Sequence, residues 1–399
     1  MRIFVLLSRI PYPLEKGDKL RAFYQIKMLS QQHEIILCAL NTLPRSDKQK
    51  AFESLQPYCR SVNFIDLPLT GRILNVVKAY FSGLPLQVGL FFNKKAAKKI
   101  RLLIEEYKPD HLYGQLVRTA PYLMNRPETK TLDYQDAFAY GLKRRTERSL
   151  FPLKTLLKLE YKQLSRFEKK AFDHFDIKTI ISEQDREWIG HPEKSKILII
   201  KNGVDLDFFK PGSESKEFDI VFTGNMHYPP NVDAAQFLIR EIMPIVWNQR
   251  PQTTVLIAGA SPHRKVLRLR SSRVTISGWL SDIRTAYNSG KIFIAPMRLG
   301  TGLQNKLLEA MAMQVPAITT SVANASLMAQ DSKEVLIGES AQELAERILM
   351  LIDNKMLQQN LTENADRLLR KNYRWEACTA KLEKSMNELY KTQMTVKDV

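Results

Sequence analysis

The sequence predicts an α/β protein made of two doubly wound, Rossmann-like domains. Short apolar segments that resemble buried strands alternate with helical segments, which is typical of parallel sheets covered by helices on both faces. The 399 residues are enough for two domains of about 150–200 residues each. A polar stretch at 212–217 interrupts the alternation and is the expected linker. We therefore expect an N-terminal domain at 1–205, a C-terminal domain at 206–375, and a last helix at 376–399 that packs back toward the N-terminal domain.

Individual strands and helices are expected from runs of apolar residues and from the turn residues between them. Strands are expected at 3–7, 34–40, 62–67, 111–113, 129–132, 179–181, 219–222, 254–258, 274–277, 292–295 and 317–319. A further strand, which begins at 198, is expected to end in a turn before 211. Helices are expected at 20–31, 94–107, 233–247, 280–289, 306–313 and 341–353, and the tail from 356 to about 393 is also expected to be helical.

Composition narrows the class of protein. Hydrophobic residues make up 44% of the chain, but no apolar run approaches the roughly 18 residues that a membrane-spanning helix needs. The first residues fit a buried strand better than a signal peptide, so a cytoplasmic location is expected. The three cysteines and six histidines are widely scattered, which favours neither a disulfide framework nor a metal site.

Charge is distributed unevenly along the chain. Residues 1–200 contain 35 Lys and Arg against 21 Asp and Glu, which accounts for +14 of the total net charge of +18. An anionic partner is therefore expected for this half. Nucleic acid is not favoured, because no nucleic-acid-binding motif is recognisable. Segments 72–99 and 142–170 combine apolar and basic residues, which suits peripheral contact with an anionic membrane at its cytoplasmic face; ordinary solvated helix faces are the alternative.

Residues 295–320 carry the clearest chemical signal. An apolar strand ends in a loop that contains Gly300 and Gly302, and a helix follows. Glycine lets a ligand approach the backbone closely, and a helix N-terminus presents N–H groups that have no intrahelical partner. With Arg298 and Lys306 flanking this loop, the segment is suited to binding phosphate. An ordinary turn between a strand and a helix is the alternative.

Glu309 lies one turn further along the same helix. A carboxylate at this place can accept hydrogen bonds from vicinal hydroxyls, such as those of a ribose. The helix dipole alone also favours Glu in a first turn, so a purely structural role is the alternative. Phosphate and a diol together suggest a nucleotide.

The pattern P-x-R-x-G-x-G-x-x-x-K-x-L-E-A-M-A in this segment resembles the donor-binding segment of family 4 glycosyltransferases (glycosyl transferases group 1), which have the GT-B fold. Four other segments carry the same resemblance: the loop with Gly17, the Asn-Gly-Val-Asp turn at 202–205, the loop with Gly224, and the Ser-Gly-Trp-Leu sequence at 277–280. The resemblance implies two domains that face each other across a cleft. The first would bind the acceptor and the second the nucleotide sugar.

The resemblance also implies roles for single residues. The donor diphosphate would be bound by Gly17, Gly224, Arg298, Gly302, Leu303, Gln304, Asn305 and Lys306. The ribose and base would contact Glu309, Gly278 and Trp279, although a half-buried core position is as plausible for Trp279. A nucleotide diphosphate sugar is the implied co-substrate. No cofactor is expected and no metal, since GT-B enzymes generally do not need one.

The glycine loop of the second domain departs from the family pattern. Many relatives carry an Arg directly after the glycine and a Lys a few residues later, whereas this chain has Asn225 and then Pro230 and Asn231. A diphosphate needs compensating cations more than it needs them at given positions. We therefore expect Arg298 and Lys306 to supply the missing charge.

The usual Glu-x7-Glu pair is also altered, because Thr301 occupies the first position and Glu309 the second. Thr301 is a catalytic candidate that can hydrogen-bond a sugar hydroxyl but cannot balance positive charge at the anomeric carbon. Stabilisation of the leaving diphosphate would then matter most.

The catalytic side chain of the first domain is expected in the segment 131–138. Asp136 is the first candidate and Asp133 the second, each as a base or polarising group for the acceptor hydroxyl. A helix N-cap is the alternative role for Asp136.

Together these features predict a retaining, hexosyltransferase-type glycosyltransferase. It would move a sugar from a UDP- or GDP-sugar to a hydroxyl of a glycan acceptor, either lipid-linked or part of a surface polysaccharide under synthesis. Two alternatives stay open: a GT-B hydrolase or epimerase of nucleotide sugars, and a non-catalytic protein that binds nucleotide sugars.

Overall fold

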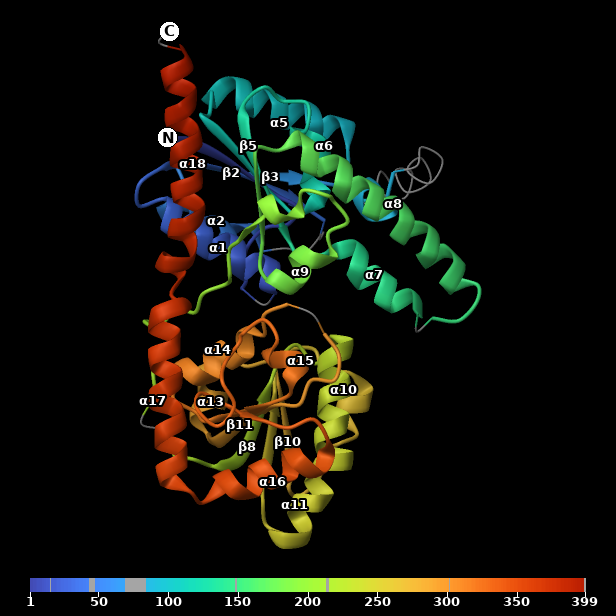
Figure 1. The fold of residues 1–399 in the computed structure, drawn as a ribbon, viewed down its shortest axis with the longest axis vertical. Helices are drawn as coiled ribbons and strands as arrows, with labels where there is room; N and C mark the ends of the chain where they lie inside the picture. Colours follow the sequence, from blue (N-terminus) through green and yellow to red (C-terminus); the bar gives the residue numbers. More distant parts are fainter. Residues whose placement is uncertain are drawn as a thin grey trace. The chain divides into compact units, whose positions relative to one another are not determined.

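The computed structural model describes residues 1–14, 16–42, 47–68, 84–147, 149–212, 215–300 and 302–397. The chain divides into two units, each a parallel sheet with helices packed on it (Figure 1). The first unit comprises Met1–Lys201 and Cys378–Val399, and the second comprises Asn202–Ala377. The amide of Val204 donates to the carbonyl of Tyr373 at 2.7 Å, which ties the start of the second unit to its end. The polar stretch 212–217 therefore lies within the second unit.

The sheet of the first unit is entirely parallel. Its strands follow the order β3 (Ser61–Asp66), β2 (Glu34–Asn41), β1 (Arg2–Leu7), β4 (His111–Gln115), β5 (Thr129–Gln135), β6 (Ile177–Ile180) and β7 (Leu198–Ile199). From β1 to β3 successive strands extend the sheet toward one edge, and from β4 to β7 they extend it toward the other edge. The switch point therefore lies between β1 and β4. In open α/β sheets, ligands bind outside the carboxyl ends of the strands at such a switch point.

Helices surround this sheet. They are α1 (Gly17–Leu29), α2 (Lys48–Leu55), η1 (Gln56–Tyr58), α4 (Leu86–Gly89), α5 (Lys94–Tyr107), η2 (Val117–Thr119), α6 (Ala120–Leu123), α7 (Phe138–Glu147), α8 (Leu153–His174), α9 (Glu183–Trp188), η3 (Lys194–Lys196) and the part of α18 (Trp375–Lys397) that begins at Cys378. Helix α1 starts three residues earlier than expected, at Gly17.

Strand β1 shows why this sheet is covered on both faces. Ile3, Val5 and Leu7 pack on one side with residues of α1, α2 and α18, whereas Phe4 and Leu6 pack on the other with residues of α5 and α8. Each of these five side chains is at most 1% exposed. A strand that is apolar at every position needs apolar cover on both faces.

The sheet of the second unit is also parallel. Its strands follow the order β10 (Val274–Gly278), β9 (Val255–Ala258), β8 (Phe218–Thr223), β11 (Gly290–Ala295), β12 (Ala317–Thr319) and β13 (Leu336–Ile337). All strands expected from the sequence are present. The strand expected to begin at 198 is β7, of two residues. Only β13, also of two residues, had not been expected.

The helices of the second unit enclose one continuous apolar core. They are α10 (Pro229–Phe237), the π-helical turn η4 (Leu238–Ile242), α11 (Met243–Gln249), α12 (Arg264–Leu267), α13 (Arg284–Asn288), α14 (Asn305–Ala312), α15 (Ser321–Asn324), α16 (Ala341–Ile352) and α17 (Lys355–Asn372). A single helix was expected at 233–247. This prediction was wrong in one respect, because the π-helical turn η4 lies between α10 and α11. Pro244 lies in the first turn of α11 and has no N–H to donate, which favours such an irregular turn.

Within the described residues, every helix is too short or too polar to cross a bilayer.

Candidate functional site

Three glycines follow neighbouring strands at the carboxyl edge of the second sheet. Gly224, Gly259 and Gly278, at the ends of β8, β9 and β10, have φ angles of 154°, 137° and 72°. A Cβ on Gly259 would lie 1.8 Å from the carbonyl oxygen of Gly224, so no larger residue fits there. Gly259 was not singled out from the sequence, although it directly follows an expected strand. The three glycines keep the backbone at this edge free of side chains.

Lys306 and the loop after β8 are joined by Asn231. The Lys306 ammonium donates to the side-chain oxygen of Asn231 at 2.5 Å. The side-chain nitrogen of Asn231 donates to the carbonyl of Asn225 at 2.9 Å, and it lies 2.7 Å from where a Cβ on Gly224 would be. The structure thus brings together two of the predicted phosphate-binding groups, the Gly224 loop and Lys306. The bridging role of Asn231 was not predicted.

Lys306 is a partly buried cation whose pKa is lowered to about 8, chiefly by burial, with Glu309 acting in the opposite direction. Its ammonium lies 5.3 Å from the centre of the Phe222 ring and 3.7 Å from the sulfur of Met297. Because these two neighbours are uncharged, only the charge of Glu309 offsets the cost of burying the ammonium, and it does so in part. A bound anion would raise the pKa of Lys306 and so hold the ammonium in its charged form.

Glu309 accepts a hydrogen bond at one carboxylate oxygen from the hydroxyl of Tyr287, at 2.7 Å. The Tyr287 hydroxyl also lies 2.8 Å from that of Thr223. Burial raises the pKa of Glu309. Within the described part of the chain, its other oxygen accepts no hydrogen bond, so it can receive one from a ligand hydroxyl. Tyr287 was not singled out from the sequence.

The N-terminus of α14 follows the glycine loop directly. Gly300 and Gly302 have φ angles of 130° and 77°, which favour glycine. Gln304 is the N-cap but makes no side-chain capping hydrogen bond. The side chain of Asn305 accepts a hydrogen bond from that of Asn202 at 3.3 Å. Asn305 and Lys306 therefore start a helix that has no side-chain cap, directly after Gly302, Leu303 and Gln304. Thr301, a predicted catalytic residue, lies outside the described residues.

Arg298 is not the uncompensated cation expected from the sequence. Its guanidinium forms ion pairs with Asp233 at 3.0 Å and Glu241 at 3.1 Å, and it stacks on the ring of Phe237 at 4.2 Å. The hydrogen bond with Asp233 raises the pKa of Arg298 further. Two carboxylates neutralise this cation, so the expected replacement of missing charge depends on Lys306.

Trp279 follows β10 and is 62% exposed, which rules out the core position that had been its alternative. Tyr228, after β8, is 55% exposed. Gly278 precedes Trp279, and no atom lies within 4 Å of where its Cβ would be. Trp279 thus presents an exposed aromatic face at the carboxyl edge of this sheet.

Asp133, in the first unit, is a buried structural carboxylate. It pairs with the Arg21 guanidinium at 2.6 Å and accepts from the hydroxyls of Tyr113 at 3.0 Å and Thr179 at 2.8 Å. Asp133 and Arg21 are each 0% exposed. Because all its neighbours are internal, the geometry favours a structural role over the predicted catalytic one.

Asp136 follows β5 and is partly exposed. Burial and then the nearby charge of Asp185 raise its pKa to about 8. It is not the helix cap that had been its alternative role, because the first amides of α7 are bonded to Glu168, with Ala139 donating at 3.0 Å. Asp185 is itself buried; it accepts hydrogen bonds from the Ser182 hydroxyl and, at 3.4 Å, from the Ala137 amide. Asp136 therefore has the environment of a proton-transfer group.

Gly17 begins α1, close to a group of charges at the carboxyl edge of the first sheet. Arg9, after β1, pairs with Asp18 at 2.9 Å. Arg118, after β4, is buried between the rings of Phe91 and Phe138, and its guanidinium donates to Gln87 at 2.7 Å. Burial and then Arg9 lower the pKa of Arg118 to about 10, while Asp18 acts in the opposite direction. Arg118 could not be singled out from the sequence, because a single arginine outside any motif gives no sign that it is buried.

The family comparison decides the class of the second unit. Residues 217–354 match the model of the family described as Glycosyl transferases group 1. This segment is a glycosyltransferase group 1 domain. It runs from the start of β8 to the end of α16, so it contains the glycine edge, Lys306 and Glu309.

Comparisons of the whole chain agree with the resemblance. An uncharacterized 44.6 kDa protein in the cps region of Klebsiella pneumoniae is 22% identical over 395 residues, which are 93% of this chain and 96% of that protein. Sucrose-phosphate synthase from Thermosynechococcus elongatus superposes with a TM-score of 0.70 at 15% identity, covering 98% of this chain and 100% of the other. Anabaena HepE in complex with UDP and glucose gives 0.69 at 12% identity, covering 96% and 99%. The glycosyltransferase therefore has the GT-B fold.

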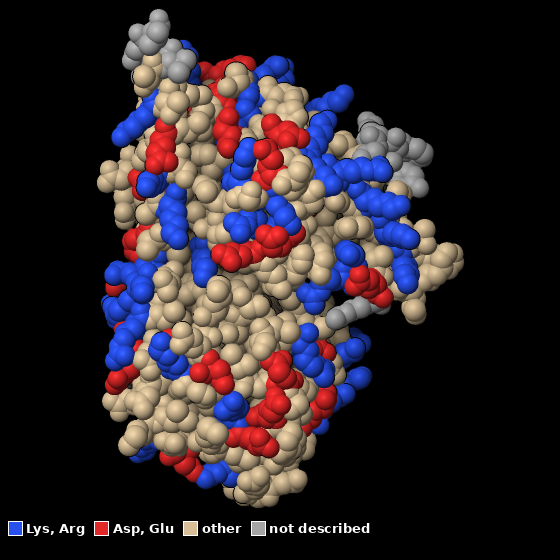
Figure 2. All heavy atoms as spheres, in the orientation of Figure 1, with Lys and Arg blue, Asp and Glu red and all other residues tan. Residues whose placement is uncertain are grey.

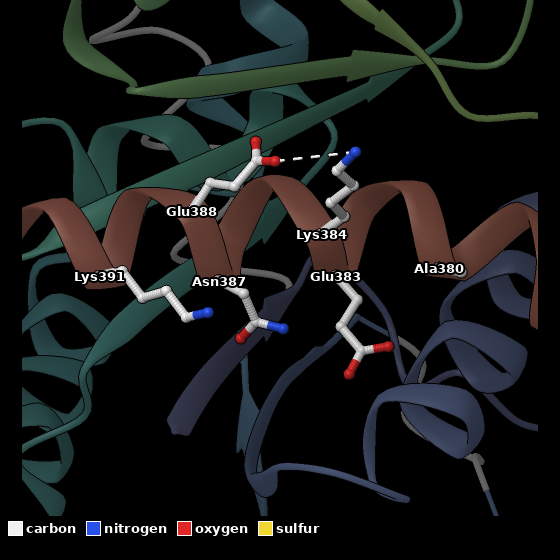
Figure 3. A pocket seen from close by; sticks show the side chains of 6 residues that line it. All are labelled: Ala380, Glu383, Lys384, Asn387, Glu388 and Lys391. Atoms are coloured by element: carbon white, nitrogen blue, oxygen red, sulfur yellow. Dashed lines mark ion pairs between the residues drawn. The ribbon is translucent and has the colours of Figure 1, made fainter.

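A shallow groove lies along α18 in the first unit (Figure 3). Its lining is Ala380, Glu383, Lys384, Asn387, Glu388 and Lys391. Lys384 pairs with Glu388, and Glu383 pairs with His33. The charges of Lys384, Glu388 and Glu383 are thus paired, and the groove contains none of the predicted site residues. No cluster of three potential metal-binding side chains occurs among the described residues; the absence of a metal requirement stays a prediction.

Proposed function

We propose that this glycosyltransferase moves a hexose from a nucleotide diphosphate sugar to a hydroxyl of a glycan acceptor, with retention of configuration at the anomeric carbon. The observation that carries the proposal is the chain of hydrogen bonds from Lys306 through Asn231 to Asn225. It places a cation that forms no ion pair with any described residue between the glycine loop and the N-terminus of α14. Backbone N–H groups and a cation are the groups that bind a diphosphate.

The proposed reaction exchanges one bond for another at the anomeric carbon. The bond from this carbon to the diphosphate oxygen breaks, and a bond to the acceptor oxygen forms on the same face of the sugar. The negative charge that develops on the diphosphate is stabilised by Lys306 and by the amides that start α14. The carboxylate of Asp136 receives the proton of the acceptor hydroxyl. No step requires an oxidant, and no metal is assigned a role.

The nucleotide is proposed to be held by Glu309 and by exposed aromatic surface. The free oxygen of Glu309 would accept from a ribose hydroxyl, and Trp279 offers a face to the base. UDP is the first nucleotide to test, because HepE was solved with UDP and glucose. GDP is the second.

The acceptor is proposed to be a lipid-linked glycan or a growing surface polysaccharide, handled on the cytoplasmic side of the membrane. The relative from the cps region of Klebsiella pneumoniae supports an acceptor of this class. The basic character of residues 1–200 also suits an anionic acceptor or membrane surface.

Thermal-shift and calorimetric titration against UDP-, GDP- and ADP-hexoses test donor binding. We expect stabilisation by one nucleotide class and its loss in Lys306→Gln. Binding should be followed by transfer to a hydroxyl acceptor, with the anomeric configuration of the product read by NMR. If none of the nucleotides stabilises the protein, the proposal is wrong.

One observation favours a second candidate function. Asp136 and Asp185 form a pair of carboxyl groups, and burial raises the pKa of both. Such a pair can move protons on and off a sugar, which hydrolysis or epimerisation of the nucleotide sugar would require. Release of free sugar, or of an epimerised nucleotide sugar, without an acceptor would identify this function. Binding without any turnover would identify a non-catalytic protein.

A further inference from the structure

The turn between α7 and α8 exposes an apolar tip. Leu150 and Phe151 are 85% and 84% exposed. Leu153, Leu156 and Leu159, in the first turns of α8, are 46%, 44% and 38% exposed. Contiguous large apolar side chains at this level of exposure mark a contact surface rather than ordinary scatter.

The same helix has a buried half, which fixes the tip in place. Leu164, Phe167, Ala171 and Phe172, in the second half of α8, belong to the apolar core of the first unit. Helix α7 lies beside α8 in Figure 1 and packs against it. The 22 residues of α8 span about 33 Å at 1.5 Å per residue. The helix pair is therefore anchored at one end and carries its apolar side chains at the other.

Basic side chains surround this tip. Exposed cations of the two helices are Lys143, Arg145, Lys154, Lys158, Lys162, Arg166, Lys169 and Lys170. Among the described residues, no carboxylate lies within ion-pair distance of any of these eight. Figure 2 shows blue side chains gathered over this hairpin, with uncharged surface at its end.

The acidic residues of α8 do not offset this charge, because two of them are used inside the fold. Glu160 accepts from the amides of Leu86 and Gln87, at 2.7 and 3.0 Å, and so caps α4. Glu168 caps α7. Both carboxylates are buried. The outward face of the hairpin is thus left cationic, with an apolar end.

We propose that the α7–α8 hairpin, residues 138–147 and 149–174, docks on the surface of an anionic lipid bilayer. Leu150 and Phe151 enter the boundary between headgroups and acyl chains, and the flanking lysines and arginines contact anionic headgroups. A nucleic acid would match the cations but leave the apolar tip in water. As a means of bringing a lipid-linked acceptor to the enzyme, this contact rests on the proposed function; the binding itself does not.

Two segments, 72–99 and 142–170, were expected from the sequence to contact a membrane. The hairpin covers the second one, 142–170. Of the first, residues 72–83 lie outside the described residues. The hairpin is therefore the surface to be tested.

The test is co-sedimentation of the full chain with vesicles. We compare phosphatidylcholine vesicles containing about 30% phosphatidylglycerol with pure phosphatidylcholine vesicles, at low and high salt. The wild type should bind the anionic vesicles at least about tenfold more tightly, and salt should weaken this binding. Equal binding to both kinds of vesicle, or no binding to anionic vesicles, would overturn the proposal.

Two variants separate the apolar and the electrostatic contributions. L150S/F151S should lower the affinity for anionic vesicles about tenfold or more, and K154Q/K158Q/K162Q should lower both the affinity and its salt dependence. The matched controls are Met356→Ser, an exposed apolar residue of the second unit that is 76% exposed, and Lys355→Gln beside it. The controls should change vesicle binding less than about twofold. If both hairpin variants bind like the wild type, the hairpin is not the docking surface.

Donor binding, measured on the same samples, keeps the two proposals distinguishable. The hairpin variants should retain the melting temperature and the nucleotide-sugar affinity of the wild type. Vesicle binding without any nucleotide-sugar binding would support the hairpin and contradict the proposed function. Nucleotide-sugar binding without vesicle binding would support donor binding as proposed and contradict the docking role of the hairpin.

Discussion

The ammonium of Lys306 and the side-chain oxygen of Asn231 are 2.5 Å apart, and this hydrogen bond joins the start of α14 to the loop after β8. Asn231 holds the ammonium in place without neutralising it, because an amide carries no charge. A carboxylate at position 231 would form an ion pair and compete with a bound diphosphate. The pair therefore positions a cation and leaves its charge available.

Replacing Lys306 with Gln should weaken binding of a nucleoside diphosphate by roughly 10- to 100-fold, the usual cost of losing a charge-assisted hydrogen bond. Calorimetric titration with UDP and GDP measures this. The pKa of Lys306, near 8 in the free protein, also predicts that affinity falls as the pH rises above 8, since the cation is then lost. The affinity of Lys306→Gln should not show this fall. An unchanged affinity in this variant would remove Lys306 from the site.

Replacing Arg298 with Gln should change diphosphate affinity less than about threefold, because Asp233 and Glu241 already neutralise this guanidinium. The expected effect is a small loss of stability. Asp233→Asn is the matched variant, and it frees part of the charge of Arg298. A loss of affinity in Arg298→Gln as large as that in Lys306→Gln would show that Arg298 leaves its ion pairs to bind the donor.

The fold could be predicted from the sequence because each strand is a local signal. Alternate side chains of β1 pack into two different apolar cores, one on each face of the sheet. The whole segment is therefore apolar, and an uninterrupted apolar run can be recognised in the sequence. The glycine loop before α14 was found for the same reason, since its glycines, its lysine and its helix are contiguous. Short strands such as β13 give too few residues for a pattern.

Partners that are distant in sequence could not be predicted. Arg298 was expected to be an available cation, but its carboxylates come from residues 57 and 65 positions earlier in the chain. Asp136 had a helix cap as its alternative role, but the cap of α7 is supplied by Glu168, 29 residues after Ala139. Both outcomes depend on which helices pack together, and single-segment patterns do not contain that information.

Replacing Glu309 with Gln should remove the preference of the protein for nucleotides that carry both ribose hydroxyls over analogues that lack them. The free oxygen of Glu309 is proposed to accept from them, so the wild type should bind UDP about tenfold or more tighter than its 2′,3′-dideoxy analogue. In Glu309→Gln this ratio should fall to about 1–3. Tyr287→Phe removes only the hydroxyl that orients the carboxylate, and it should give an intermediate ratio. Equal binding of the two nucleotides by the wild type would contradict the ribose assignment.

The pH dependence of transfer tests Asp136. A base must be deprotonated, so a pKa near 8 predicts that kcat/KM rises with pH up to about 8. Above that pH, loss of the Lys306 cation should lower kcat/KM again. Asp136→Asn should lower the rate by about 10²–10⁴ and abolish this rise. Asp185→Asn removes a neighbouring negative charge and should move the rise to lower pH. If Asp136→Asn kept the wild-type profile, another group would be the base.

The stability of the first unit should depend on the ionisation of Glu168. Burial raises the pKa of Glu168 to about 8 from its ordinary value of 4.5, so the folded protein keeps this proton over a range in which the unfolded chain has lost it. The free energy of unfolding should therefore fall as the pH rises, by about 4 kcal/mol from this group between about pH 5 and about pH 8.5. Glu168→Gln keeps an oxygen that accepts from the amide of Ala139, but it cannot ionise. The free energy of unfolding of this variant should therefore fall less with pH than that of the wild type, by the contribution of Glu168. Urea unfolding between pH 5 and about pH 8.5 measures the difference, with Glu106→Gln, an exposed carboxyl on α5, as the control. Parallel stability curves for Glu168→Gln and the wild type would show that Glu168 is already ionised in the fold.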